Sequence, residues 1–375
     1  MLKVVTIVGT RPEIIRLSRI IPKLDENFEH TLIHTGQNYD FSLNEIFFKD
    51  LEIREPDIFL NIARDNPMKT IAGVIENIDQ ELEKISPDAV LILGDTNSSL
   101  SAIPAKRRKI PIFHMEAGNR CFDFRVPEEI NRRIVDVISD VNLTYSEIAR
   151  QYLISEGFDK NRVINTGSPM KEVINFYMNK INASQILKEL DIKKNKYFLV
   201  SIHREENVDN RAKMNRLPEI LNKLSKDFRF PVIVSTHPRA KKMIKDSKLE
   251  FSKDVRFLEP FSYSDYCNLQ VNSKCVLSDS GTITEESSIL NFPALNLRVS
   301  HERPEGLEEG AVMSTGFSMD KILNAMDILE NQSRGSKRDI KIVKDYDVDN
   351  VSEKIVRIIL GNIDLVNQNV WHKEI

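Results

Sequence analysis

The feature that most constrains the fold is an alternation of short apolar runs with longer stretches of helical period. It begins at Lys3 and begins again after Gly167. Most of the short runs are apolar throughout, which indicates parallel strands covered by helices on both faces. The sequence therefore predicts an α/β protein of two doubly wound, Rossmann-like domains that face a cleft. The expected strands are Lys3–Val8, Thr31–Thr35, Ala89–Leu93, Ile110–His114, Val141–Tyr145, Val163–Thr166, Tyr197–Ile202, Val232–Ser235, Val255–Leu258, Cys275–Leu277 and Ala294–Leu297.

The segments between these runs predict the helices and the division of the chain. Because 375 residues exceed what one hydrophobic core usually supports, two domains are expected. Asn175–Lys196 is rich in Lys and Asn and indicates a linker with the first helix of the second domain. The expected boundaries are 1–170, 171–360 and a tail at 361–375. The expected helices include Glu13–Leu24, Met68–Ile85, Glu128–Ser139 and, packed against either domain, Val351–Leu360.

Composition excludes several classes of protein. A net charge of -3 gives no broad basic surface, so no nucleic-acid partner is expected. No apolar run approaches the roughly 20 residues that span a bilayer, so no membrane insertion is expected. The apolar stretch in Met1–Gly9 is too short for a signal peptide. The three cysteines, Cys121, Cys267 and Cys275, lack CxxC spacing and fit reduced packing thiols in a cytoplasmic protein.

Charged side chains of the first half follow the predicted strands, where ligands bind in such folds. Asp95 ends an apolar run and is either a helix N-cap or a catalytic group. Glu116 follows the next strand, and Glu128 shares a helical face with Arg132, which alone would read as a surface ion pair. Three carboxylates in one cleft can hold different pKa values, so the convergence of Asp95, Glu116 and Glu128 predicts acid–base chemistry.

Other segments at strand ends predict an anion site. The turn from Gly9 to Glu13 opens a helix, with Arg11 and Arg16 nearby, or is an ordinary strand-to-helix turn. His203, beside Arg204, can bind phosphate or share in proton transfer, and His237 repeats this pattern less clearly. In the second half, small residues lead from a strand into a helix, where backbone amides can bind a diphosphate. These residues are Ser280, Gly281 and Thr282. Glu285 or Glu286 can accept from ribose hydroxyls, and Arg303 is suited to phosphate.

Motifs for cofactors and nucleophiles are missing from the sequence. There is no GxGxxG fingerprint or Walker A loop, so neither a nicotinamide cofactor nor a nucleoside triphosphate is predicted to bind. There is no HExxH or Cys/His cluster of zinc spacing, so no metal is predicted. The GxSxG elbow of a serine nucleophile is also missing.

Taken together, these motifs resemble the non-hydrolysing UDP-N-acetylglucosamine 2-epimerases in order and spacing from residue 3 to about residue 360. The resemblance implies a GT-B-like fold, a homodimer, no cofactor, and interconversion of UDP-N-acetylglucosamine and UDP-N-acetylmannosamine through a glycal intermediate. It implies a UDP-binding second domain and a catalytic set of Asp95, Glu116, Glu128 and His203. The motifs and the resemblance together predict the residues that bind substrate and UDP, namely Arg11, Arg16, Gln37, Arg132, Arg204, His237, Ser280, Gly281, Thr282, Glu286 and Arg303.

The sequence departs from the family pattern in several places. Arg16 replaces the usual lysine and Thr282 replaces a glycine. The segment Asn38-Tyr39-Asp40 differs from the best-known bacterial members and borders the site of allosteric activation in some of them, which leaves activation open. Met115, Asn119–Cys121 and Phe124–Pro127 resemble a capsule and O-antigen subgroup that makes UDP-N-acetyl-L-fucosamine from a 6-deoxy-L-talo sugar.

Three other functions remain as alternatives to a non-hydrolysing epimerase. A GT-B glycosyltransferase would share the fold and UDP site but use an acceptor, a sugar-nucleotide sensor would bind without turnover, and a hydrolysing epimerase would release free sugar and UDP.

Overall fold

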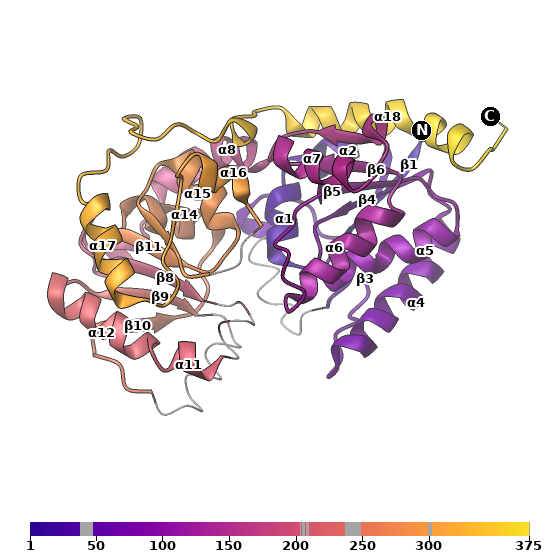
Figure 1. Cartoon of the computed structure of the whole chain (residues 1–375). Helices are drawn as coiled ribbons and strands as arrows, with labels where there is room; N and C mark the ends of the chain where they lie inside the picture. The colour runs from indigo at the N-terminus through magenta and orange to yellow at the C-terminus, as the bar shows by residue number, and fades with distance from the viewer. Residues whose placement is uncertain are drawn as a thin grey trace. The chain divides into compact units, whose positions relative to one another are not determined.

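The computed structural model describes residues 1–37, 48–202, 204, 207, 210–236, 249–298 and 302–374, and it divides into two compact units. The first unit comprises Met1–Phe176 and Lys344–Ile375, and the second comprises Tyr177–Val343 (Figure 1). The division expected from the sequence differs at the C-terminal end, because residues 344 onwards lie in the first unit rather than in the second domain and a tail.

The described residues of the first unit form a seven-stranded parallel sheet in the order β3-β2-β1-β4-β5-β6-β7. Strands β1, β4 and β5 are buried along almost their whole length, as expected for strands covered on both faces. Their hydrophobic side chains join one core that includes Val5, Ile7, Val90, Ile92 and Ile112. The strands are β1 Lys3–Val8, β2 Glu29–His34, β3 Ile58–Phe59, β4 Ala89–Leu93, β5 Ile112–Ala117, β6 Val141–Thr144 and β7 Val163–Asn165.

Helices of the first unit are amphipathic and bury one face each. In α4, the buried residues Val74, Ile78 and Leu82 recur every four positions and pack into the sheet core. The helices are α1 Arg11–Leu17, α2 Ile20–Asn27, α4 Pro67–Ile85, α5 Ala102–Arg107, α6 Pro127–Ile138, α7 Glu147–Ser155 and α18 Val351–Asn369, with short 3-10 turns at Asn97–Ser101, Lys160–Arg162 and Lys344–Tyr346. Helix α8, Met170–Ala183, runs across the division between the units.

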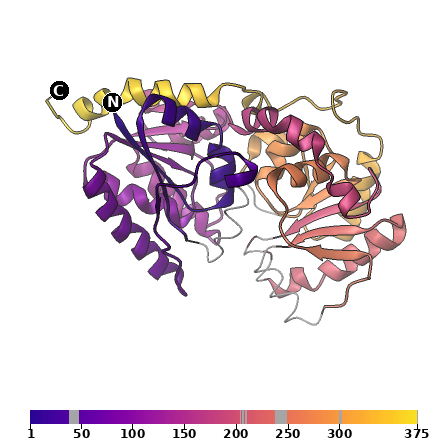
Figure 2. The same cartoon turned by 180° about the vertical axis from the view of Figure 1, so that it is seen from behind.

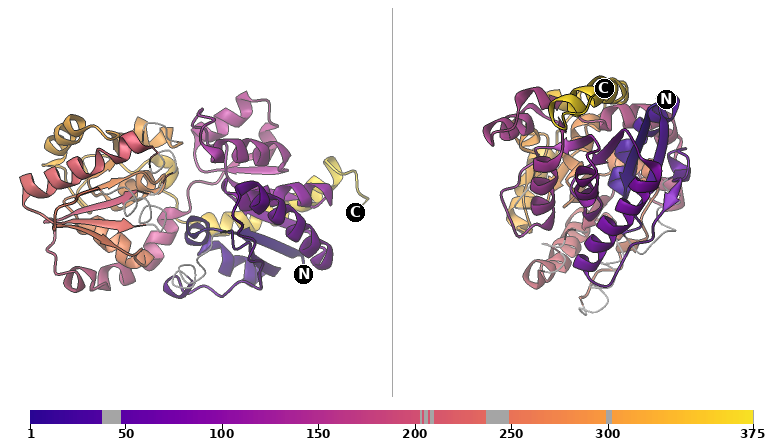
Figure 3. Two further views of the ribbon diagram at one scale, coloured as in Figure 1. Left: turned by 90° about the horizontal axis from the view of Figure 1, so that it is seen from below. Right: turned by 90° about the vertical axis from the view of Figure 1, so that its right-hand side faces the viewer.

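The second unit has its own parallel sheet, which the described residues form in the order β10-β9-β8-β11-β12-β13 (Figure 3). Its core includes Phe198, Val200, Leu221, Val234 and Leu277. The strands are β8 Phe198–Ile202, β9 Val232–Thr236, β10 Val255–Leu258, β11 Cys275–Ser278, β12 Ala294–Asn296 and β13 Met313–Ser314. The helices are α9 Ile186–Glu189, α11 Arg211–Met214, α12 Leu217–Phe228, α14 Tyr263–Asn272, α15 Thr282–Leu290, α16 Pro304–Glu308 and α17 Met319–Leu329.

Helix α18 returns the chain to the first unit, where both chain ends lie (Figure 2). It packs against α2 through a stripe at spacings of four that includes Ile355, Ile359 and Ile363. No helix in the described part of the chain is both long and apolar enough to cross a membrane.

Both sheets are doubly wound, which confirms the predicted fold class, although one predicted helix is wrong. The stretch Glu13–Leu24 forms two helices, because a continuous helix would place the ring of Pro22 against the carbonyl of Ser18. Strands β3 and β13 were not predicted, since two residues carry no periodicity.

Candidate active site

The strand order reverses direction at two points, and the chemically active side chains gather there. In the first unit β1 lies beside β4, and in the second unit β8 lies beside β11. The loops at the carboxyl ends of such neighbouring strands diverge and leave room for a ligand. The loops concerned contain Gly9–Arg11, Gly94–Thr96, Arg204 and Asp279–Gly281.

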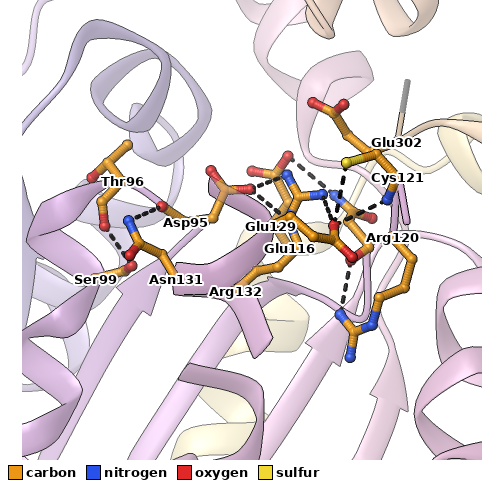
Figure 4. Close-up of polar contacts among 12 residues, drawn as sticks. Asp95, Thr96, Ser99, Glu116, Arg120, Cys121, Glu129, Asn131, Arg132 and Glu302 are labelled. Atoms are coloured by element: carbon orange, nitrogen blue, oxygen red, sulfur yellow. Dashed lines mark hydrogen bonds and ion pairs between the residues drawn. The ribbon is translucent and has the colours of Figure 1, made fainter. Parts of the chain in front are cut away.

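Asp95 lies two residues after the end of β4 and forms an ion pair with Arg132 of α6 (Figure 4). Arg132 donates from Nε at 2.9 Å and from Nη2 at 2.6 Å to the same carboxylate oxygen, Oδ2. Asn131 donates to the backbone oxygen of Asp95 at 3.0 Å. The N-cap of the following 3-10 turn is Thr96, so the carboxylate of Asp95 is not a helix cap.

The direction of the Glu116 side chain results from an irregularity near the end of β5. The pairing of β5 with β6 shifts register between Met115 and Ala117, and Glu116 has φ of 64°. Such a bulge turns a side chain away from the regular alternation of a strand. The carboxylate receives a hydrogen bond from Arg16 Nη1 at 3.1 Å and one from Asn119 Nδ2 at 3.4 Å. A side chain at Gly94 would meet Glu116 Oε2 at 3.3 Å, so the two strand ends are close together.

The turn after β1 is built around Glu13, which the sequence analysis did not name as a site residue. Its Oε2 accepts from the backbone N–H of Gly9 at 2.5 Å and of Thr10 at 3.2 Å, and its Oε1 accepts from Thr96 Oγ1 at 2.7 Å. Burial raises the pKa of Glu13 to about 7 against the opposing effect of these hydrogen bonds. Its position three residues after the N-cap Thr10, typical of a capping box, was the available signal.

Gln37 and Ser98 extend this group toward β2. Ser98 Oγ lies 2.7 Å from Thr35 Oγ1 and donates to Gln37 Oε1 at 3.1 Å. A Cβ at Gly9 would lie 2.0 Å from Ser98 Oγ, so only glycine fits at the start of this turn. The β1 and β4 loops are therefore closely packed.

Glu129 is a second residue that sequence reasoning missed. It is fully buried in the first turn of α6 and accepts from Arg132 Nη1 at 2.9 Å and from Arg133 Nε at 3.0 Å. The adjacent Glu128 is half-buried in the same turn. Both carboxylates are favoured there by the helix dipole.

A buried histidine lies beneath the end of β4. His114 Nε2 lies 2.8 Å from the carbonyl oxygen of Gly94, and Nδ1 lies 3.0 Å from Asp136 Oδ1. Burial alone would lower the pKa of His114, but the hydrogen bond and charge of Asp136 raise it overall. The same contact lowers the pKa of Asp136 despite its burial. The pair lies beneath the loop that holds Asp95.

In the second unit, Asp279 connects the loops after β8 and β11. Its Oδ2 accepts from the backbone N–H of Arg204 at 3.1 Å and from Asn207 Nδ2 at 3.0 Å. Arg204 Nη2 reaches Glu302 Oε1 at 3.5 Å, and Glu302 also accepts from Arg298 at 2.8 Å. These buried contacts fix the two loops that flank the start of α15.

Helix α15 begins at Thr282, in the segment where the sequence predicts a diphosphate site. Gly281 is its N-cap, and Ser280 Oγ lies 2.9 Å from Thr282 Oγ1. Further along the helix, Glu286 accepts from Gln270 at 2.5 Å. Arg303, at the N-cap of α16, donates to Glu285 at 3.4 Å.

Two candidate residues and one candidate segment fall outside the described part of the chain, namely His203, His237 and Asn38–Asp40. Arg11 is the first residue of α1 and is half-buried. Among the described residues, no group of three His, Cys, Asp or Glu side chains is placed to hold a metal ion.

The arrangement of the first unit suits proton transfer beside a developing positive charge. Carboxylates stand at the ends of two adjacent strands, and each is held by a guanidinium from a different helix. The second unit offers helix amides and arginines, which suit a diphosphate.

The chain is similar to known proteins over nearly its whole length. The family model described as UDP-N-acetylglucosamine 2-epimerase matches residues 22–360. The UDP-N-acetylglucosamine 2-epimerase of Methanocaldococcus jannaschii is 34% identical over 368 residues, which cover 96% of this chain and 99% of the relative. A structure of the Methanocaldococcus jannaschii UDP-GlcNAc 2-epimerase in complex with UDP-GlcNAc and UDP has a TM-score of 0.89, at 34% identity, covering 96% of this chain and 100% of that one.

Two further relatives extend the comparison. The UDP-N-acetylglucosamine 2-epimerase from Rickettsia bellii is 51% identical, with a TM-score of 0.93, over 100% of both chains. The UDP-2,3-diacetamido-2,3-dideoxy-D-glucuronate 2-epimerase of Pseudomonas aeruginosa is 31% identical over 329 residues, or 86% of this chain and 91% of the relative. On this evidence the chain belongs to the UDP-N-acetylglucosamine 2-epimerase family and is an isomerase.

Proposed function

We propose that this protein interconverts UDP-N-acetylglucosamine and UDP-N-acetylmannosamine without hydrolysing either. The observation that carries the proposal is the pair of carboxylates, Asp95 and Glu116, placed by adjacent strand ends and held by Arg132 and Arg16. The relatives named as UDP-N-acetylglucosamine 2-epimerases, at 34% and 51% identity, support this sugar as the substrate.

The chemistry of the substrate explains the need for several carboxylates. The proton on C2 is not alpha to a carbonyl group, so cleavage of the bond between C1 and the diphosphate oxygen must run ahead of its removal. The bonding electrons leave with UDP, the proton passes to a carboxylate, and a C1–C2 double bond forms. Return of UDP to C1 and of a proton to the opposite face of C2 gives the epimer. Charged side chains near C1 stabilise the positive charge that builds up there.

The proposed roles rest on the positions described above and, for His203 and His237, on the sequence resemblance alone. Asp95, Glu116 and Glu128 move the proton and stabilise the charge at C1, and we assign His203 to the same catalytic group. The residues proposed to hold the UDP-sugar are Arg11, Arg16, Gln37, Arg132, Arg204, His237, Ser280, Gly281, Thr282, Glu286 and Arg303. The amides at the start of α15 are suited to the departing diphosphate.

The direct test is incubation of the protein alone with UDP-N-acetylglucosamine. We expect the manno epimer at equilibrium with its precursor, together with traces of glycal and UDP. A glycosyltransferase would give hydrolysis or nothing without an acceptor, a hydrolysing epimerase would give free sugar, and a sensor would leave the substrate unchanged. Each of these outcomes would contradict the proposal.

The sugar specificity is tested by assaying related substrates side by side. The alternative substrate is UDP-2-acetamido-2,6-dideoxy-L-talose, which the resemblance of Met115, Asn119–Cys121 and Phe124–Pro127 to the capsule and O-antigen subgroup suggests. The diacetamido-glucuronate named for the Pseudomonas aeruginosa relative is a useful third compound. A pocket that hydrogen-bonds a sugar hydroxyl discriminates by about 10⁴-fold, so kcat/KM should separate the three. If the protein turned over the talo compound but not UDP-N-acetylglucosamine, its role would be in capsule or O-antigen synthesis. The elimination–addition mechanism would remain the same.

Activity should persist in EDTA and without added nicotinamide cofactor, because the sequence contains neither a metal motif nor a dinucleotide fingerprint. The measurement is the initial rate of epimerisation after dialysis against chelator. Loss of the rate on chelation, with recovery on adding a divalent ion, would overturn this part of the proposal.

We also propose that the protein is a cytoplasmic homodimer. Helix α6 exposes Ile130, Ile134 and Val137, and the preceding loop exposes Phe122 and Phe124. Exposed apolar residues gathered in this way favour an interface. The three cysteines are free thiols, as is usual in a reducing compartment. Sedimentation of the wild type and of Ile134→Glu tests the dimer, which the variant should weaken.

A further inference from the structure

A row of alternately charged side chains leads from Asp95 into the interior of the first unit. Arg132 donates from Nε and Nη2 to Asp95, while its Nη1 donates to Glu129 Oε2 at 2.9 Å. Arg132 is 2% exposed and Glu129 is 0% exposed. One guanidinium therefore joins the carboxylate at the strand end to a second carboxylate that has no access to substrate.

Glu129 is itself held on both of its oxygens (Figure 4). Oε2 also accepts from the backbone N–H of Cys121 at 3.0 Å and lies 3.4 Å from Cys121 Sγ. Burial raises the pKa of the Cys121 thiol to about 11, so the thiol keeps its proton and donates it. Oε1 accepts from Arg133 Nε at 3.0 Å. The carboxylate of Glu129 is thus fixed by donors from two segments of the chain.

The row continues away from Glu129 and returns to the backbone beside Asp95. Arg133 lies 3.5 Å from Glu156, which receives two hydrogen bonds from Arg120 at 2.9 and 2.6 Å. Arg120 donates to Asp136 at 2.7 Å, and Asp136 contacts His114, whose Nε2 lies 2.8 Å from the carbonyl of Gly94. The loop that carries Asp95 is therefore held at two points, the Asp95 side chain and the backbone carbonyl of Gly94.

We propose that Glu129 is a positioning residue for the epimerisation: it sets the orientation of Arg132, and Arg132 sets the position of the Asp95 carboxylate. The guanidinium is a planar fork, so fixing Nη1 on Glu129 also fixes the directions of Nε and Nη2. The expected change in kcat rests on the proposed function, whereas the expected change in the position of Arg132 does not depend on it.

Glu129→Gln tests this role because it keeps the shape and removes the charge. The amide can offer one acceptor oxygen, so its NH₂ group must face a donor nitrogen of either Arg132 or Arg133. Even where the amide oxygen faces Arg132, a weaker neutral hydrogen bond replaces the charge-assisted bond that fixed the guanidinium. A resulting displacement of about 1 Å at Asp95 costs about 10- to 100-fold in kcat. KM should rise less than kcat falls, because Arg132 is only one of several residues proposed to hold the UDP-sugar.

A double-mutant cycle separates positioning from general support of the fold. Arg132→Lys leaves a single ammonium that cannot reproduce the planar fork spanning Glu129 and Asp95. In that background Glu129→Gln should lower kcat no further. Independent losses that multiply in the double variant would overturn the proposal. The matched control is Glu147→Gln, which removes an exposed carboxylate of α7 that pairs with Arg150 outside this row; its kcat should stay within about 3-fold of wild type.

A crystal structure of Glu129→Gln tests the inference without relying on the substrate. We expect Arg132 to leave Asp95 Oδ2, and an unchanged Arg132–Asp95 contact would refute the proposal whatever the protein's activity. A wild type that does not epimerise UDP-N-acetylglucosamine would instead refute the proposed function. If Glu129→Gln fails to fold, Glu129→Asp takes its place in both experiments. It keeps the charge but is shorter by one methylene, and the same displacement of Arg132 is expected.

Discussion

Asp95 and Glu116 occupy equivalent places on neighbouring strands but are held in different ways. Asp95 receives both of its guanidinium bonds on one oxygen, Oδ2. Glu116 receives Arg16 on one oxygen and Asn119 on the other. Two carboxylates with different partners can serve different steps of one reaction.

The first prediction at this scale concerns the three proposed acid–base carboxylates. Asp95→Asn, Glu116→Gln and Glu128→Gln should each lower kcat about 100-fold or more, the usual scale for losing an acid–base group. Affinity for UDP, measured by calorimetry, should stay near that of the wild type because the diphosphate is proposed to bind elsewhere. Near-normal kcat in all three variants would show that the catalytic group is misassigned.

A second residue-scale prediction concerns the pH dependence of stability. Burial raises the pKa of Glu13 to about 7 from 4.5, so the folded state holds more protons than the unfolded state between these values. The free energy of unfolding should therefore fall as pH rises from about 4.5 to about 7, by about 3 kcal/mol at most from this residue.

Glu13→Gln removes this titration and should flatten that part of the stability curve. The measurement is urea unfolding followed by circular dichroism at several pH values. Glu26→Gln is a suitable control because Glu26 is on the surface in an exposed pair with Lys23. Equal slopes for the wild type and Glu13→Gln would contradict the assignment.

At the scale of elements, β1, β4 and β10 have the bounds that the sequence predicted. For β1 and β4 the reason is that largely apolar runs define buried parallel strands. The arrangement of the site residues was harder to predict from the sequence. Asp95 and Glu116 follow from being at strand ends, whereas the bulge that turns Glu116 depends on pairing with β6. Glu129 resembles any acidic residue in a first helical turn, and only the packed structure shows that it is buried between two arginines.

The turn from β1 to α1 gives the element-scale prediction. In Gly9→Ala the new methyl group would lie 2.0 Å from Ser98 Oγ and 2.5 Å from Thr35 Oγ1, so the β1 and β4 loops must separate. Overpacking of this kind costs about 1–3 kcal/mol. We expect a lower Tm and a lower kcat, the latter because Thr96 and Asp95 move with the β4 loop.

Gly361→Ala is the matched control for this substitution. No atom lies within 4 Å of a Cβ built at Gly361, which is inside α18. Alanine favours a helix over glycine by about 1 kcal/mol, so this variant should be as stable as the wild type or more so. A Gly9→Ala protein with unchanged Tm would show that the two loops are less tightly packed than described.

At the scale of the whole molecule, the first unit depends on residues from both ends of the sequence. Deletion of residues 351–375 should destabilise this unit, because Ile355, Ile359 and Ile363 of α18 pack against α2. Hydrogen exchange read by mass spectrometry should show faster exchange in α2 and β1, with β8 and β11 unchanged. Uniform protection across both units after the deletion would contradict the division of the chain.

The reaction as a whole makes a further prediction about solvent hydrogen. If the C2 proton is exchanged with water at the glycal stage, epimer formed in D₂O should carry one deuterium at C2. Mass spectrometry of the recovered UDP-sugar measures the label. Unlabelled product would indicate hydride transfer or a route that leaves the C2–H bond intact.

The return of α18 to the first unit has a consequence for how the protein is made. On the ribosome, residues 177–343 emerge after most of the first unit and before the helix that covers α2. The second unit is thus continuous in sequence and can fold as soon as it has been translated, whereas the unit synthesised first must wait for the last segment. During that interval the apolar surface of α2 is without its cover, so nascent chains stalled between residues 343 and 351 should be the form that chaperones retain longest.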